Sequence, residues 1–147
     1  MSDFFTQSSL LDRRDIVRSD NPVRPPCYGP GMDLVGFLDD YINKIYVARD
    51  AEAARQFIAD PCLRHEHGEL VTMSMDQNIA RITAFLHKYP CITFVNRCVV
   101  ANGDHVVTCF DATLENDSVI SGVEVFKVVD GKVTEMWNSL PGSGAWG

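Results

Sequence analysis

Apolar residues recur every three or four positions in three segments, which is the spacing of one face of an α-helix. The first segment follows Asp33, whose side chain suits a helix N-cap. In the second segment, ARDAEAARQFIAD, Asp50 is the expected N-cap and Pro61 ends the helix. In the third segment, SMDQNIARITAFLHKYP, Ser74 or Asp76 is the expected N-cap. The residues expected to be buried are Val35, Leu38, Tyr41, Ile42, Ile45 and Tyr46 in the first helix, Ala53, Phe57 and Ile58 in the second, and Ile79, Ile82, Ala84, Phe85 and Leu86 in the third.

The period changes to two after residue 90. The segments CITFVNRCVVA, HVVTCFDATLE, SVISGVEVFKVVD and KVTEMWNSL are rich in Val, Ile, Thr and Phe, and the turn sequences NGD, END and DG separate them. They predict four strands of an antiparallel meander. PCLRHEHGELVTM, before the third helix, predicts one short strand followed by a loop at Gly68. This order indicates an α+β domain in which helices cover one face of a sheet.

Residues 1–31 differ from the rest of the chain. They contain four of the seven prolines and show no sustained hydrophobic period. We therefore expect an extended N-terminal arm at 1–31, packed on its own domain or on a partner subunit, and a single domain at 32–147.

Charge and composition narrow the classes of partner. The formal net charge is −7, and the basic residues are scattered, which disfavours nucleic-acid binding. No apolar run approaches the ~20 residues that span a bilayer, and the N-terminal sequence lacks the apolar core of a secretory signal. The five cysteines are odd in number and include no C-x-x-C pair, as expected of reduced thiols. We expect a cytoplasmic protein that binds neither nucleic acid nor membrane.

The polar segment Arg64–Glu69 holds two histidines, two glutamates and one arginine. His65, His67 and Glu69 would alternate on one strand face and could ligate zinc or iron. No helical H-E-x-x-H motif and no pair of cysteine ligands supports this interpretation. We therefore expect no metal site.

The segments FIADPCLRHEHGE, NGDHVV and VEVFKVVDGKVTEMWNS, in this order, resemble the NTF2-like superfamily, and within it the SnoaL-like polyketide cyclase and ketosteroid-isomerase-like group. The resemblance runs from about Asp33 to Leu140, and the DGK-V-x-E-x-W hairpin is its most specific part. It implies a cone-shaped NTF2-like (cystatin-like) fold, in which a curved, mixed or antiparallel sheet wraps around three helices and a deep apolar pocket. Members differ in function, so the pocket residues must decide the activity.

Strand alternation places Glu124 and Phe126 on one face, and Met136 and Asn138 on one face of the last strand. If the DGK hairpin pairs these strands, Glu124 and Asn138 both face into the cone. By resemblance, Glu124 takes the place of an acid that stays protonated and donates a hydrogen bond to an oxyanion. Asn138 stands where SnoaL-like cyclases often carry an aspartate; it cannot transfer a proton at neutral pH but could orient substrate or water. The alternative is that Glu124 forms a structural pair with Arg97 or a histidine.

By the same resemblance, His65 matches a pocket histidine and Glu66 a proton-shuttling carboxylate, but only one of two neighbours in a strand can face inward. We favour His65 as the base, because the ordinary pKa of a histidine, ~6.5, already suits a base near neutral pH. A carboxylate would need burial to raise its pKa. Tyr41 falls where isomerase-like members place an oxyanion-hole tyrosine, and it could equally be a core aromatic. The remaining candidates for substrate binding are Glu66, Asp111, Phe126, Met136, Tyr46 and Phe57.

The sheet face opposite Glu124 is also apolar, with Val123, Val125, Trp137 and Val99 expected on it. An apolar patch of this kind favours an interaction surface, so we expect a homodimer through this outer face.

The sequence thus favours cofactor-free acid–base chemistry, such as isomerisation, aldol cyclisation or dehydration, on an apolar cyclic substrate of the carbonyl type. The expected catalytic residues are His65, Glu124, Asn138 and Tyr41. The alternative is a non-catalytic ligand-binding or dimerisation module. Epoxide hydrolysis is disfavoured, because it needs an arginine two residues before an aspartate, and Cys109 holds that place before Asp111.

Overall fold

The structure is a computed structural model that describes residues 31–139 and 141–146, so nearly all of the predicted arm at 1–31 lies outside the described residues. No helix in the described part of the chain is long and apolar enough to cross a membrane. The elements in order are α1 (Leu34–Ile42), the π-helical turn η1 (Asn43–Val47), the 3-10 turn η2 (Ala51–Ala53), α2 (Ala54–Phe57), β1 (Ile58–Glu66), β2 (Glu69–Met73), α3 (Met75–Lys88), β3 (Thr93–Asn102), β4 (His105–Thr113), β5 (Val119–Val129), β6 (Lys132–Asn138) and β7 (Gly142–Ser143).

The predicted helix starts are confirmed by side-chain caps. Asp33, Asp50 and Ser74 each accept a hydrogen bond from a backbone amide in the first turn, at 3.0 to 3.3 Å. Ser74 rather than Asp76 caps α3 and forms a reciprocal capping box. The second helical segment is shorter than predicted, because the chain becomes extended at Ile58 and joins the sheet as β1.

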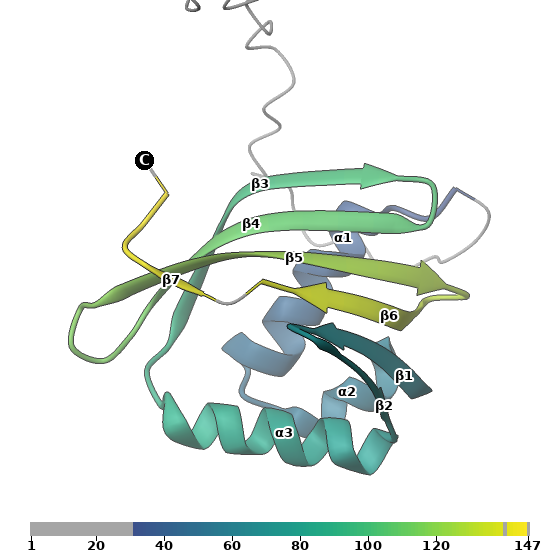
Figure 1. The fold of residues 1–147 in the computed structure, drawn as a ribbon, viewed down its shortest axis with the longest axis horizontal. Helices are drawn as coiled ribbons and strands as arrows, with labels where there is room; N and C mark the ends of the chain where they lie inside the picture. Colours follow the sequence, from purple (N-terminus) through teal and green to yellow (C-terminus); the bar gives the residue numbers. More distant parts are fainter. Residues whose placement is uncertain (1–30, 140, 147) are drawn as a thin grey trace, which may run out of the picture.

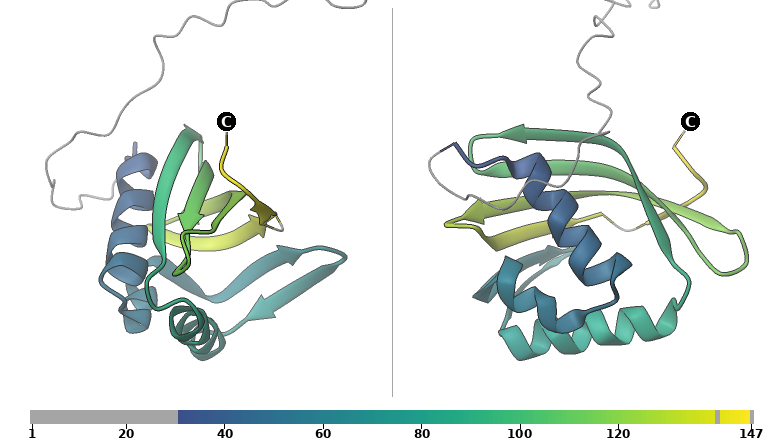
Figure 2. Two further views of the ribbon diagram at one scale, coloured as in Figure 1. Left: turned by 90° about the vertical axis from the view of Figure 1, so that its left-hand side faces the viewer. Right: turned by 180° about the vertical axis from the view of Figure 1, so that it is seen from behind.

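The predicted α+β fold is confirmed as an open, mixed sheet with helices on one face (Figures 1 and 2). The strand order is β2-β1-β6-β5-β4-β3, with β7 paired to β5. The predicted meander corresponds to β3 through β6, and all its pairs are antiparallel. β1 pairs with β6 in parallel, so the sheet is mixed. The predicted single strand before α3 is a hairpin, β1–β2.

One face of the sheet carries α1 and α3, and none of the helices in the described part of the chain covers the outer face (Figure 2). Val99 is not on the outer face, contrary to the prediction. A β-bulge between Asn96 and Cys98 shifts the register, so Val99 pairs with Thr108 and packs against the buried core. The other predicted outer residues follow the expected alternation, with Val125 opposite Trp137 in the β5–β6 pair.

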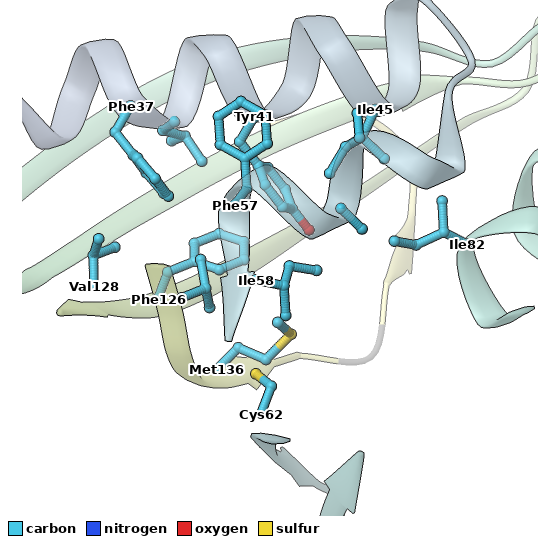
Figure 3. Close-up of a cluster of buried hydrophobic side chains, with 14 of the residues drawn as sticks. Phe37, Tyr41, Ile45, Phe57, Ile58, Cys62, Ile82, Phe126, Val128 and Met136 are labelled. Atoms are coloured by element: carbon cyan, nitrogen blue, oxygen red, sulfur yellow. The ribbon is translucent and has the colours of Figure 1, made fainter. Parts of the chain in front are cut away.

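The hydrophobic core lies between the helices and the inner sheet face, and Figure 3 shows its central side chains. The rings of Phe37, Tyr41, Phe57 and Phe126 contact one another, with centroids 5.5 to 6.0 Å apart. Phe57 and Met136, predicted to contact substrate, are 3% and 1% exposed. Both belong to this core, and neither is among the residues that line the cavity described below.

Candidate functional site

A cavity of about 210 Å³ opens between the inner face of the sheet and the helices. It is smaller than the roughly 300–1,000 Å³ of sites for drug-sized ligands, so it suits a small molecule. Its wall is mostly apolar, with few polar groups. The lining residues are Leu38, Tyr41, Ile42, Tyr46, Arg64, Arg81, Ile82, Phe85, Ile92, Phe94, Asn96, Thr108, Phe110, Ile120, Glu124, Phe126, Asn138, Ser139 and Pro141.

Three polar side chains form a hydrogen-bonded chain along the cavity wall. Arg64 Nη2 donates to Asn138 Oδ1 at 2.8 Å, and Asn138 Nδ2 donates to Glu124 Oε1 at 2.6 Å. The register of β5 and β6 places Glu124 opposite Asn138, as predicted. The alternative pairing of Glu124 with Arg97 is wrong, because Arg97 binds Asp111 on the other face. This series of hydrogen bonds fixes the Asn138 amide and holds the Glu124 carboxyl group at the cavity.

Burial raises the pKa of Glu124 above its ordinary value. The hydrogen bond from Asn138 and the positive charges of Arg64 and Arg81 lower this pKa, but they do not outweigh burial. Within the described part of the chain, Asn138 is the only hydrogen-bond donor to this carboxyl group. The second carboxyl oxygen is therefore available to a ligand, and a carboxylate of raised pKa is suited to accept a proton.

Tyr41 and Tyr46 form a second polar group, on the helical wall of the cavity. Their hydroxyl groups interact, and this interaction raises the pKa of Tyr41 and lowers that of Tyr46. Burial is the largest effect on both residues and raises both pKa values. Figure 3 shows the Tyr41 ring inside the core. No other described residue accepts the Tyr46 hydroxyl proton, so this proton can go to a ligand oxygen.

His65 does not face the cavity, contrary to the prediction. Its Nε2 lies 2.6 Å from Glu135 Oε1, and its ring stacks on Trp137 with centroids 4.6 Å apart. The parallel pairing of β1 with β6 sets Arg64 opposite Met136 on the inner face and His65 opposite Trp137 on the outer face. The inward residue of the opening polar segment is therefore Arg64, which is 3% exposed.

Glu66 shares the inner side of β1 with Arg64 but does not line the cavity. Its carboxylate accepts a hydrogen bond from Arg64 Nε at 3.2 Å, and its side chain is 50% exposed at the strand end. The described residues include no group of three histidine, cysteine, aspartate or glutamate side chains that could hold a metal ion.

Asp111 also lies away from the cavity, because Thr108 and Phe110 take the inward positions of β4. Its carboxylate accepts hydrogen bonds from the backbone amide of Trp146 at 3.0 Å and from Arg97 at 2.6 Å. These two contacts lower the pKa of Asp111. Asp111 thus anchors the C-terminal segment, whose start brings Ser139 and Pro141 to the cavity.

The sequence analysis placed Tyr41, Tyr46, Glu124, Phe126 and Asn138 at the pocket, and all five line the cavity. It missed five polar residues of the wall. Thr108 Oγ1 donates to Asn96 Oδ1 at 2.9 Å, which pairs these two side chains on the inner sheet face. Arg81 could have been found from its spacing, since it precedes Phe85 by four residues and so shares its helix face. The missed residues are Arg64, Arg81, Asn96, Thr108 and Ser139.

An open cone of sheet and helices, with a small apolar cavity around one carboxyl group, defines a pocket protein of the NTF2-like class. Residues 38–136 match the model of the SnoaL-like domain, and the chain belongs to this family. No curated protein is similar enough to the sequence to count as a match.

Solved structures of other proteins share the fold. A protein from Acidithiobacillus ferrooxidans that is proposed to be a polyketide cyclase is 18% identical, with a TM-score of 0.63 over 70% of this chain and 84% of that one. IdmH from Streptomyces antibioticus, also proposed to be a polyketide cyclase, is 15% identical, with a TM-score of 0.60 over 74% of this chain and 91% of that one. An NTF2-like protein of unknown function from Mesorhizobium loti is 17% identical, with a TM-score of 0.60 over 74% and 90% of the two chains.

Proposed function

We propose that the protein catalyses cofactor-free proton transfer on a small cyclic carbonyl compound, with Glu124 as the base. The observation that carries this proposal is a single carboxyl group, of raised pKa, on the wall of a mostly apolar cavity. Similarity to proteins proposed to be polyketide cyclases is consistent with a ring-forming or ring-bearing substrate.

In the proposed reaction, the Glu124 carboxylate removes a proton from the carbon next to the carbonyl group. The electron pair moves onto the carbonyl oxygen, which accepts a hydrogen bond from the Tyr46 hydroxyl. Tyr41, whose hydroxyl interacts with that of Tyr46, positions it. Protonated Glu124 then returns the proton to another carbon in isomerisation, or to a leaving hydroxyl group in dehydration. Asn138 positions Glu124 throughout.

A non-catalytic ligand-binding module is the second candidate. It is favoured by Asn138, which stands where family members of the cyclase type often carry an acid–base aspartate. This candidate predicts that Glu124 is held in a structural pair, with no cavity beside it. The cavity beside Glu124 and its second, unpaired carboxyl oxygen support the catalytic proposal instead.

Deuterium exchange into cyclic ketones tests the proposal. Wild-type protein in D₂O is expected to speed exchange at the carbon next to the carbonyl of 2-tetralone above the buffer rate, as followed by NMR. His65→Ala is expected to keep this activity within about twofold, because His65 lies on the outer face and a general base contributes ~10²–10⁴-fold. Loss of exchange in a folded His65→Ala variant would place the base outside the cavity and contradict the proposal.

We also propose that the chain forms a homodimer through the outer sheet face and resides in the cytoplasm. No helix among residues 31–139 covers this face, and Val123, Val125 and Trp137 are only half-buried there in the single chain. The described cysteines are free thiols, including Cys98 and Cys109, which are register partners on adjacent strands. Free thiols in such a pair suit a reducing compartment.

A further inference from the structure

Arg81 is a charged side chain of the cavity wall whose hydrogen-bonding capacity is unused. It projects from α3 together with Ile82 and Phe85, two apolar residues of the same wall. Its Nε atom is buried and has no hydrogen-bond partner. No described residue forms a hydrogen bond or an ion pair with its guanidinium group. A buried donor without a partner is costly, so this group is placed to meet something that the protein alone does not provide.

Arg64, the other arginine of the cavity, shows the contrast. Its guanidinium group reaches Glu66, Asn138 and the sulfur of Met136. It is therefore occupied in holding the wall together, whereas Arg81 is not.

The charge balance of the cavity identifies the kind of ligand. Its charged lining residues are Arg64, Arg81 and Glu124. Arg64 is paired with Glu66, and no described carboxylate forms an ion pair with Arg81, so the guanidinium group of Arg81 is the unpaired positive charge of the wall. A monoanion would neutralise this charge, and a phosphate monoester, with its charge of about −1.5 to −2 at pH 7, would exceed it. A guanidinium group matches a planar carboxylate with two parallel hydrogen bonds.

We propose that Arg81 forms an anion-binding subsite that holds a carboxylate group on the cyclic ligand of this cavity. The apolar side chains around it would contact the ring, and Glu124 would face the carbon that loses the proton. Arg81 is then the residue that selects carboxylate-bearing substrates over neutral ones. This inference rests on the proposed function for the identity of the site, but it is tested by binding alone.

Calorimetric titration with 1-naphthoate and with its neutral relative 1-naphthamide tests the subsite. Wild-type protein is expected to bind naphthoate more tightly than naphthamide, and Arg81→Gln is expected to weaken naphthoate binding by about 10- to 100-fold. Naphthamide binding should change little. Arg81→Lys keeps the charge without the planar fork and is expected to retain part of the preference, which also guards against a variant that fails to fold. Arg55→Gln, which removes an exposed guanidinium that does not line the cavity, is the matched control and should bind as wild type does.

Equal affinity of wild-type protein for naphthoate and naphthamide would overturn the inference, as would a preference that survives in Arg81→Gln. Tighter, Arg81-dependent binding of 1-naphthyl phosphate than of naphthoate would overturn the choice of a carboxylate. These results are distinguishable from failure of the proposed function. Ketone exchange without a carboxylate preference would remove the subsite only, and a carboxylate preference without any exchange would remove the catalytic proposal only.

Discussion

Replacing Glu124 by glutamine is expected to lower the rate of ketone deuterium exchange by roughly 10²–10⁴-fold, the usual contribution of a positioned general base. Glutamine has nearly the same shape, and its carbonyl oxygen can still accept the hydrogen bond from Asn138 Nδ2, which is 2.6 Å long in the wild-type protein. The substitution therefore removes proton transfer and leaves the wall in place. NMR detection of exchange into 2-tetralone, for wild type and variant at equal concentration, measures the effect.

Glu135→Gln is the control for this prediction. Glu135 lies on the outer face beside His65, so its loss should leave exchange unchanged.

The stability of Glu124→Gln supplies a second check. The folded-state pKa of Glu124 is raised above the unfolded value of 4.5, so its ionisation opposes folding as the pH rises through the folded-state pKa. The variant should be at least as stable as wild type at pH 8, and the gain should vanish below about pH 4.5. A folded Glu124→Gln variant with full exchange activity would contradict the assignment of the base.

Replacing Arg64 by methionine is expected to shift the pH dependence of exchange to higher pH. The positive charge of Arg64 lowers the pKa of Glu124, so its removal raises that pKa and delays formation of the carboxylate. The partly buried Asn138 Oδ1 also loses its donor, at a cost of about 1 kcal/mol in the free energy of unfolding. Methionine fills much of the space of the arginine stem, so the backbone should be preserved. The rate of exchange between pH 4 and 9, together with urea unfolding, measures both effects.

Glu66→Gln is the matched control for Arg64. Glu66 also binds Arg64, but its side chain is 50% exposed, and ion pairs at the surface contribute little. We expect its pH profile and stability to stay close to those of wild type. An Arg64→Met profile that coincides with that of wild type would mean that Arg64 does not act on the base.

The sequence predicted the fold well because its local signals agree with the tertiary structure. Asp33, Asp50 and Ser74 cap helices, and the period-two segments become β3 through β6. The errors arise where tertiary contacts decide. The second helical segment ends early because Ile58 pairs with β6, and Val99 turns inward because of a bulge that no sequence period reveals.

The site was predicted in part for the same reason. Glu124 and Asn138 face the cavity because they are partners in the part of the β5–β6 hairpin that stays in register beyond the bulge at Lys127, where alternation fixes the side of each residue. Which of His65 and Glu66 faces inward depends on how β1 pairs with β6. This parallel pairing joins residues about 70 positions apart, so alternation within β1 alone could not predict the inward residue. Arg64 was missed because charged residues are usually exposed, and only the assembled cavity shows that this one is not.

The most direct test of the account is the titration of the Glu124 carboxyl group by ¹³C NMR, with Glu124→Gln to assign its signal. The central claim is that the cavity keeps one desolvated carboxyl group ready for proton transfer. The account predicts a titration midpoint above 4.5, because burial outweighs the hydrogen bond from Asn138 and the charges of the two arginines. A midpoint at or below 4.5 would contradict it, since Glu124 would then be a carboxylate stabilised by its partners and poorly suited to take a proton.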